Sequence, residues 1–500
     1  MADLATAPRA ISAAIQPVVP GFHPDPTICR VGDDYYLAHS SFEYFPGAPI
    51  FHSRDLVSWT QIGNILDRRS QFRAGTSGPS TGIYGSTLRH HDGRFWFATT
   101  NVSDFTAGQV IVCATDPAGP WSEPVFVPEA IGIDPDLCWD DDGTCYLTWH
   151  VLDFTVGGQG IRQAPIDLES GRLLEPGYPV WQGSGLPTAE GPHLYKIGDL
   201  WYLMLAEGGT ERGHCVTIAR GSSPRGPFES CPQNPVFTHR SSPHPVQNVG
   251  HADLIQSPLG EWAAVYLGVR PRGSTPGFHV LGRETFVAGI DWVDGWPVFV
   301  EGAFEVPPDD EGFVDEFSTG ILDPRWVAPD NEPGTVTEHV ADGGLRFVSW
   351  GEATDVVCAR VKDFMWEAEA EVETSGAIGL RLDDRHWCAV IFEEEQARAS
   401  VQIGDIRQQL GVVELGTKTA TLRIATTPPQ TAPVPFGYAG PDDVVLSVAT
   451  DDGTSIEIAR LDGRYFSTEV AAGFTGRMLA LGAPSPAGIV RRVTYRPLTD

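Results

Sequence analysis

Three acidic residues in similar local contexts are the strongest candidates for chemistry in this sequence. Asp25, Asp134 and Glu190 occur in the phrases FHPDPTI, GIDPDLC and AEGPHLY, and the phrases GIYGSTL and GHADLIQ hold Ser86 and His251 at what we predict to be the equivalent position. Two carboxyl groups on either side of a glycosidic bond suffice to hydrolyse it, because one protonates the leaving oxygen while the other activates water or attacks directly. The sequence supplies this pair and a third carboxyl group.

A repeated aromatic strand predicts how these residues are positioned. A turn rich in Asp and Gly precedes an aromatic strand five times, at intervals of about 50 to 60 residues marked by Tyr35, Phe95, Tyr146, Trp201 and Trp262. The strands are short and show almost no helical periodicity, so each copy is expected to be one small antiparallel sheet. Five such sheets arranged radially form a β-propeller. An open solenoid of sheets is the alternative.

The candidate residues lie about 9 to 12 residues before the aromatic strands. They should therefore fall on the innermost strand of each blade, where all five side chains face one channel. Like charges brought together raise one another's pKa and destabilise the fold, so such a cluster is expected only where it serves a function. The alternative, that acids cap turns, suits Asp33, Asp92 and residues 140–142 better.

The repeat stops near residues 306–317, VPPDDEGFVDEF, whose prolines and acids are typical of a linker. Later runs such as AIGLRLDD and TATLRIATT alternate apolar and polar residues, which indicates a β-sandwich. A chain of 500 residues is also long enough for two hydrophobic cores. We therefore predict an all-β protein with a five-bladed β-propeller at 17–305 and a β-sandwich of the jelly-roll, concanavalin-like kind at 312–500.

The charge balance excludes some partners. The net charge is −31, which would repel nucleic acid and anionic membranes but not a neutral sugar, although acidity can also serve solubility alone. No apolar run approaches the roughly 20 residues that span a bilayer. The first 16 residues lack the features of a signal peptide, so we expect a short tail and a cytoplasmic protein. The eight cysteines are scattered without a CxxC pair, and we expect buried, reduced thiols.

Seven motifs in register resemble glycoside hydrolase family 43, which contains β-xylosidases and α-L-arabinofuranosidases. The segment from PGFHPDPTICRVGDDYYLAHSS to DLVSWTQIG resembles that family's first blade, and GIDPDLCWDDDG, AEGPHLYK, LAEGGT, VTIARG, GHADLI and LGRETF follow in the family's order. The final sandwich resembles the accessory domain of the xylosidase-like members. The resemblance implies an exo-acting, inverting glycosidase that releases terminal xylose or arabinofuranose from xylo- or arabino-oligosaccharides.

The resemblance also implies a role for each charged residue. Asp25 would be the general base and Glu190 the general acid, while Asp134 would orient the acid and raise its pKa. An inverting enzyme needs room for water, so Asp25 and Glu190 should lie roughly 6.5 to 9.5 Å apart. By the same likeness His251 and Arg283 would line the pocket, with Arg283 donating to sugar hydroxyls and to Asp134.

Aromatic residues would complete the sugar site. Phe42 would pack against the sugar in the first subsite. Where the family commonly has Trp-Ala-Pro, this chain has Tyr84, Gly85 and Ser86, which should change the pocket wall. Phe474, at the tip of the loop AAGFTG in the second domain, either closes the pocket or packs in the domain interface.

No cofactor is expected to be required. The family resemblance is compatible with a calcium ion near His251, but imidazole is a poor ligand for that hard cation, so no metal ligand is assigned. The sequence leaves open xylose against arabinose, the accepted chain length and a homo-oligomeric state.

Three other functions fit parts of the pattern. A five-bladed propeller can be a non-catalytic sugar-binding module, although three converging acids exceed what binding needs. The chain could also be an arabinofuranosidase without xylosidase activity. The invertase-like group combines the same two folds but carries an Asn-Asp-Pro-Asn phrase, where this sequence has HPDPT.

Overall fold

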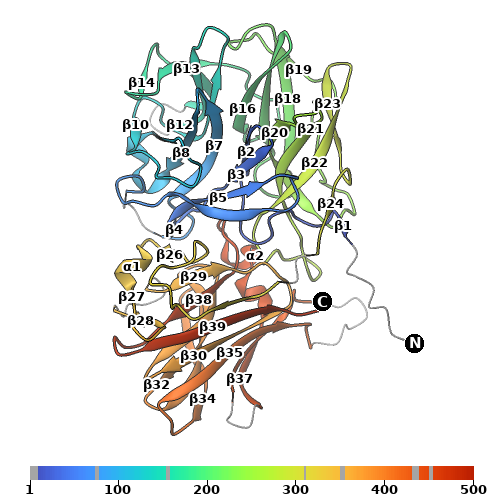
Figure 1. The fold of residues 1–500 in the computed structure, drawn as a ribbon. Helices are drawn as coiled ribbons and strands as arrows, with labels where there is room; N and C mark the ends of the chain where they lie inside the picture. Colours follow the sequence, from blue (N-terminus) through green and yellow to red (C-terminus); the bar gives the residue numbers. More distant parts are fainter. Residues whose placement is uncertain are drawn as a thin grey trace, which may run out of the picture.

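The computed structural model describes residues 10–73, 78–153, 158–308, 311–348, 355–430, 439–449 and 454–499, and Figure 1 shows the two β-sheet units that they form. Parts of the predicted tail (1–9), the predicted linker (309–310) and residue 500 lie outside these ranges. The domain limits 17–305 and 312–500 stay predictions.

The first unit is the predicted propeller of five antiparallel sheets, each built from one continuous stretch of chain. The strands, in sheet order, are β2 (Thr27–Val31), β3 (Asp34–Ala38), β5 (Gly47–Ser53) and β6 (Thr60–Leu66); β7 (Ile83–His91), β8 (Arg94–Asn101), β9 (Gln109–Ala114) and β10 (Val125–Val127); β11 (Ile133–Trp139), β12 (Cys145–Asp153) and β13 (Gly158–Asp167), with β14 (Arg172–Leu173) and β15 (Tyr178–Pro179); β16 (Glu190–Ile197), β17 (Leu200–Glu207), β18 (Cys215–Gly221) and β19 (Glu229–Ser230); β20 (Gln247–Gln256), β21 (Trp262–Val269), β22 (Glu284–Val293) and β23 (Trp296–Val300).

The predicted repeat of aromatic residues marks the second strand of every blade. Tyr35, Phe95, Tyr146 and Trp201 are buried and Trp262 is partly buried. They lie on β3, β8, β12, β17 and β21. The strand before each one is the edge strand of its sheet, and these edge strands pack side by side around the axis. The prediction that the candidate acids fall on inner strands is confirmed for Asp134 on β11 and Glu190 on β16, whereas Asp25 lies two residues before β2.

The prediction of a tail is wrong for its last part. Strand β1 (Ile11–Ser12) pairs with β24 (Glu305–Val306), and Ala13 is buried in a core cluster that includes Val18 and Val306. The pairing satisfies backbone groups of β24 where the chain leaves the fifth blade.

The second unit is the predicted β-sandwich. One sheet contains β27 (Thr337–His339), β28 (Leu345–Phe347), β39 (Ile489–Pro497), β30 (Trp366–Glu373), β35 (Thr419–Thr427), β36 (Asp443–Ala449) and β37 (Ser455–Asp462), with β25 (Phe313–Asp315) on β39; the other contains β29 (Val357–Arg360), β38 (Met478–Gly482), β31 (Gly376–Arg381), β32 (His386–Glu393), β33 (Gln396–Ile403) and β34 (Ile406–Glu414). The α-helices α1 (Pro333–Val336) and α2 (Thr468–Ala471) and the 3-10 helices η1 (Val102–Ala107) and η2 (Gly463–Phe466) are short. None of the helices in the described ranges could cross a membrane.

The two units share a continuous interface, where β4 (Tyr44–Phe45) of the propeller pairs with β26 (Ala328–Pro329). In Figure 1 both strands and α2 lie at the boundary between the units. The Arg381 side chain donates to the Tyr44 hydroxyl over 2.5 Å, and Arg360 donates to the Phe22 carbonyl over 2.7 Å. One apolar cluster combines Phe22, Phe42 and Tyr44 with Val327, Cys358 and Met478 of the second unit. The interface is thus a shared core.

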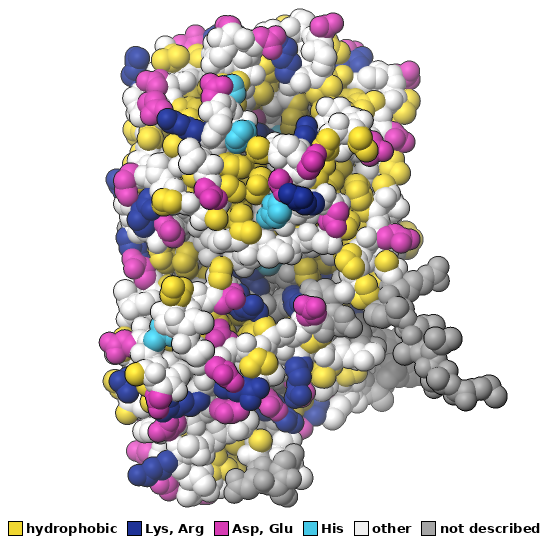
Figure 2. All heavy atoms as spheres, in the orientation of Figure 1, with side chains coloured by type: hydrophobic (Ala, Val, Ile, Leu, Met, Phe, Trp, Pro, Cys, Tyr) yellow, Lys and Arg dark blue, Asp and Glu magenta, His cyan; other side chains and the backbone are white. Residues whose placement is uncertain are grey.

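All eight cysteines are free, and six of them are buried, as predicted. Figure 2 shows acidic side chains scattered over the visible face of both units, interspersed with Lys and Arg, rather than gathered in one patch.

A buried ionic layer crosses the propeller axis. Arg89 on β7 donates to Asp136 on β11 over 2.8 Å and to Asp253 on β20 over 2.7 Å. Thr27 on β2 and Tyr195 on β16 also donate to Asp253. Both carboxyl groups are fully buried, and although burial raises their pKa, Arg89 and the other donors lower it below the usual value. The layer therefore joins all five inner strands.

Replacing Arg89 by Met should leave two buried carboxylates without their cation. We expect the free energy of unfolding to fall by about 3–5 kcal/mol, measured by denaturant titration. Arg94→Met is the matched control, because Arg94 forms an exposed pair with Glu169 worth at most about 1 kcal/mol. Equal stability of the two variants would show that the axial layer does not hold the blades together.

Candidate active site

One cavity of about 460 Å³ is lined by eight of the residues that the sequence predicts for the site, but not by Ser86. It lies at the ends of inner strands and is bounded by a loop of the sandwich. Its wall includes these eight residues, Asp25, Phe42, Tyr84, Asp134, Glu190, His251, Arg283 and Phe474, together with Gly85, Ile133, Thr188, Gly208, Gly209, Thr210, Glu211 and His214.

An unusual backbone conformation places the polar residues. Asp25, Asp134 and His251 have φ angles of 51°, 55° and 46°, and Gly191 has 56°. Asp and His adopt this region more readily than most residues, and Gly adopts it freely. At Asp134, Gly191 and His251 the pairing with the next strand also shifts register. The repeated irregularity turns these positions out of the regular ladder and toward the cavity.

The structure corrects the predicted equivalence of two blades. Gly191 has the positive φ angle that Asp134 has in its own blade, so Gly191 is the counterpart of Asp134. Glu190 lies one residue earlier. In the second blade Tyr84 and Gly85 line the cavity, whereas Ser86 does not. The register shift between Ile83 and Ser86 sends Ser86 into the core, where its hydroxyl is buried. The spacing of strands in the sequence could not reveal these shifts.

Asp25 is held as a carboxylate. Its Oδ2 accepts from the Ser40 hydroxyl over 2.6 Å. Its Oδ1 accepts from Arg283 Nη1 over 2.8 Å, so the acid that Arg283 binds is Asp25 and not the predicted Asp134. His251 Nδ1 lies 3.4 Å from the same Oδ1. Burial opposes the charge, but the cations Arg283 and His251 and the Ser40 hydroxyl outweigh it and lower the pKa of Asp25 far below its usual value.

Glu190 has the opposite electrostatic environment. Burial, followed by the negative charge of Asp134, raises its pKa to about 8. The pKa of Asp134 is also raised by burial, while the nearby His251 and a hydrogen bond from the Gly191 amide over 3.1 Å favour its charged form. Glu190 is not among the groups that raise the pKa of Asp134, whereas Asp134 raises that of Glu190, so Asp134 is the group that ionises first and its charge keeps the proton on Glu190.

His251 supplies positive charge between the three acids. Burial alone would lower its pKa, but the contacts with Asp25, Asp134 and Glu190 raise it to about 9. The imidazole is therefore a cation at neutral pH. Between His251 and the axial ionic layer lies His193. The centroids of the two imidazole rings are 6.3 Å apart, and His193 Nδ1 is 2.9 Å from Arg89 Nη2 of that layer.

The surroundings of His251 do not match a calcium site. Calcium takes six to eight oxygen ligands. Here the next groups along the axis are the His193 imidazole and the Arg89 guanidinium, and a protonated His251 has no lone pair to offer. We therefore assign no chemical step to a metal at this position.

Aromatic rings form one side of the cavity. Phe474 of the sandwich stacks on Phe42 at 5.6 Å between ring centroids, and Tyr84 packs edge-on against both. The Phe474 amide donates to the Ser80 hydroxyl over 2.8 Å. The Arg283 guanidinium lies 5.6 Å from both Phe rings. Phe474 thus packs in the interface and lines the cavity at once.

Several residues of the site were not predicted from the sequence. Ser40 follows β3 and binds Asp25, and Thr210 accepts a hydrogen bond from Arg283 over 3.2 Å. His214 is a buried part of the wall, and burial lowers its pKa to about 4. Thr210 belongs to the motif LAEGGT, which supported the family resemblance but to which no binding or catalytic role was assigned.

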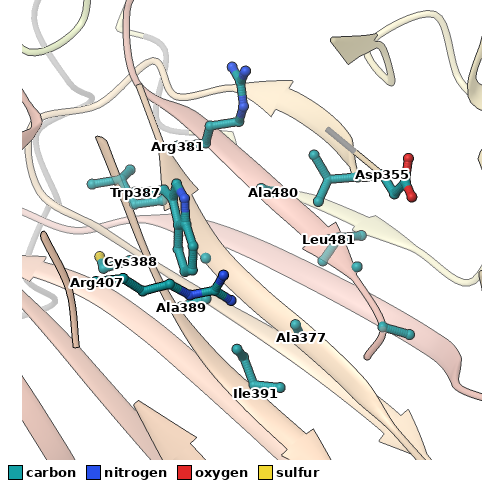
Figure 3. Close-up of a pocket in the computed structure, with 15 residues that line it drawn as sticks. Asp355, Ala377, Arg381, Trp387, Cys388, Ala389, Ile391, Arg407, Ala480 and Leu481 are labelled. Carbon is teal, nitrogen blue, oxygen red and sulfur yellow. The ribbon is translucent and has the colours of Figure 1, made fainter. Parts of the chain in front are cut away.

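A hollow over the six-stranded sheet of the sandwich is a poor alternative site (Figure 3). Its wall is mostly aliphatic, with Trp387 and Arg407 in cation–π contact at 5.4 Å. Asp355 is the one acid among the described residues that line it. It therefore lacks the pair of carboxyl groups present in the propeller.

The chain is similar to known glycoside hydrolases in sequence and in fold. The sequence profile of glycosyl hydrolases family 43 matches residues 14–297. A xylosidase/arabinosidase of Butyrivibrio fibrisolvens is 46% identical over 303 residues, which are 58% of this chain and 57% of that protein. A non-reducing-end α-L-arabinofuranosidase of Bacteroides ovatus is 44% identical over 286 residues, which are 56% of this chain and 52% of that protein. The chain thus matches somewhat more than half the length of these curated relatives.

The likeness to a solved structure extends over both units. The Xyloglucan PUL GH43B structure from Bacteroides ovatus superposes with a TM-score of 0.86 and 32% identity, covering 98% of this chain and 100% of that one.

The packing around Gly85 gives a test of the site's geometry. A Cβ at Gly85 would lie 2.3 Å from Asp134 Oδ1 and 3.0 Å from His251 Cε1. Gly85→Ala should therefore lower the free energy of unfolding by about 1–3 kcal/mol, measured by denaturant titration. At Gly63 the nearest atom would be 4.0 Å away, so Gly63→Ala is the matched control and should cost less. Equal values for the two variants would contradict the described contact.

Proposed function

This chain belongs to glycosyl hydrolases family 43, and from this premise we propose that it is an exo-acting, inverting glycosidase that releases terminal xylose or arabinofuranose from oligosaccharides. The observation that carries the proposal is the opposed protonation of two carboxyl groups in one cavity. Asp25 has a lowered pKa, and Glu190 has a pKa raised to about 8. Carboxyl groups whose environments separate their pKa values are suited to act as base and acid.

Glu190 is the proposed general acid. With a pKa of about 8 it keeps its proton near neutral pH and can pass it to the glycosidic oxygen as the bond breaks. Asp134 is a positioning residue for this step. Its charge favours the protonated form of Glu190, and its hydrogen bond from the Gly191 amide fixes it beside the acid.

Asp25 is the proposed general base, which receives a proton from the attacking water. A carboxylate of low pKa is a weak base. This weakness is tolerable because the transition state resembles an oxocarbenium ion, and water becomes more acidic as it bonds to that electron-poor carbon. In return, the contacts with Arg283 and His251 keep Asp25 ionised and fix the direction of its oxygens.

The aromatic wall supports action on a terminal sugar. Phe42, Tyr84 and Phe474 offer apolar surface to the faces of a sugar ring, and Phe474 narrows the cavity from the sandwich side. The Arg283 Nε atom is buried without a hydrogen-bond partner in the described part of the chain and is suited to donate to a sugar hydroxyl. The names of the relatives, a xylosidase/arabinosidase and an α-L-arabinofuranosidase, support a pentose as that sugar.

Substitution of the two acids distinguishes their roles. Glu190→Gln should reduce kcat/KM by about 10²–10⁴-fold for glycosides with poor leaving groups and far less for activated aryl glycosides, which need no proton. Asp25→Asn should reduce kcat/KM by a similar factor for both kinds of substrate, because water must be activated in each case. Initial rates with aryl xylosides and arabinofuranosides of graded leaving-group acidity measure both effects.

Glu211→Gln is the control, because Glu211 is an exposed acid on the same cavity wall. It should retain most activity toward every substrate. Near-full activity of Asp25→Asn, or an equal loss in Glu190→Gln for all leaving groups, would refute the assigned roles.

The pH dependence tests the coupling between Asp134 and Glu190. As pH rises through about 8, Glu190 loses its proton and kcat/KM should fall. In Asp134→Asn the repulsion that raises the pKa of Glu190 is removed, so this alkaline limb should move to lower pH. The profile of kcat/KM against pH for the two proteins gives the answer, and a limb that stays in place or moves upward would exclude the coupling.

A further inference from the structure

Away from the active-site cavity, three side chains with metal-ligand atoms meet at the outer end of the fifth blade. His239 and His244 lie on the connection between β19 and β20, and Glu301 directly follows β23. One ligand atom from each residue lies within 4.8 Å of the other two. The fold thus brings together residues that lie up to 62 positions apart in the sequence.

The orientation of His239 directs a lone pair at Glu301. His239 Nδ1 lies 2.8 Å from the Val246 carbonyl oxygen, which can only accept, so Nδ1 carries a proton. In the neutral ring the unprotonated Nε2 then faces Glu301 Oε1 at 2.9 Å. Among the residues that the structure describes, neither atom has a hydrogen-bond partner, and His239 is only 5% exposed. Two buried acceptors face each other, which is costly unless a cation lies between them.

His244 adds a second imidazole to the same point. Its Nε2 lies 4.0 Å from Glu301 Oε1, and its ring packs against that of His239 with centroids 3.9 Å apart. Its Nδ1 lies 3.2 Å from both the carbonyl oxygen and the amide nitrogen of Val246. The tautomer in which Nδ1 donates to the carbonyl oxygen leaves Nε2 free as a ligand. A backbone carbonyl that accepts from the second ring nitrogen is a common support for metal-bound histidine.

We propose that His239, His244 and Glu301 bind a zinc ion or a similar divalent transition-metal ion. Two imidazole nitrogens and one carboxylate oxygen suit such ions better than calcium or magnesium, which prefer oxygen alone. Ligands about 2.0–2.1 Å from a tetrahedral zinc ion lie about 3.3 Å apart. The distances of 2.9 Å and 4.0 Å to Glu301 Oε1 lie on either side of that value, so small side-chain shifts suffice.

Access and charge are compatible with binding. The side chains of His244 and Glu301 are 25% and 28% exposed, so an ion can enter from solvent and a water molecule can take the fourth position. The chain's net charge of −31 also favours a cation. A bound ion would link the end of β23 to the connection that precedes β20. Strand β20 carries His251.

Zinc titration of the tag-free, metal-stripped full-length protein tests the site. Calorimetry should give one zinc ion per chain, and zinc should raise the temperature of thermal unfolding because it binds only the folded site. Cobalt(II) should give the visible absorption of a tetrahedral complex. His244→Ala and Glu301→Gln should each abolish these three effects, and both residues are exposed enough for the variants to fold.

His52→Ala is the matched control. His52 Nε2 pairs with the single carboxylate of Asp34 at 2.7 Å and has no second imidazole in that contact. This variant should bind zinc as the unsubstituted protein does. Failure of the unsubstituted protein to bind zinc would overturn the proposal in favour of a simple His239–Glu301 ion pair. Stoichiometric binding that persists in both His244→Ala and Glu301→Gln would overturn it too, because the ion would then lie elsewhere.

Discussion

Compensation of buried charge along the propeller axis is the constraint on which the structure depends. In one layer Arg89 neutralises Asp136 and Asp253, and in the next His251 lies among the acids of the cavity. Buried ions are stable only when paired, so the inner strands must converge for either layer to exist. The same convergence buries both carboxyl groups of the acid–base pair. At Asp25 the cation Arg283 outweighs burial and the pKa is lowered, whereas at Glu190 burial and then the charge of Asp134 raise the pKa.

Much of the fold was predictable because each blade repeats the same local signals. The turn and aromatic strand of every copy predicted five sheets, and the apolar alternation after residue 317 predicted the sandwich; both are confirmed. The membership of the family was also predicted from motifs and is confirmed. The acids could be chosen because they stand at the starts of inner strands, and the structure brings Asp25, Asp134 and Glu190 into one cavity.

What the sequence could not predict are shifts of one residue and contacts between distant segments. The register shift that places Tyr84 in the cavity wall and buries Ser86 depends on pairing with the neighbouring strand. The ionic layer around Arg89 joins residues from every blade, and no local pattern marks it. The stacking of Phe474 on Phe42 also arises from packing of the sandwich on the propeller. It makes the second unit part of the cavity wall.

The stereochemical course of hydrolysis tests the central claim most directly. As the proposed general base, Asp25 activates water and forms no bond to the sugar, so the anomeric configuration is inverted in one displacement. Proton NMR of the first sugar released, recorded before mutarotation, should show the anomer opposite to that of the substrate. A first product that retains the substrate's configuration would contradict the account, because a carboxylate would then have acted as nucleophile.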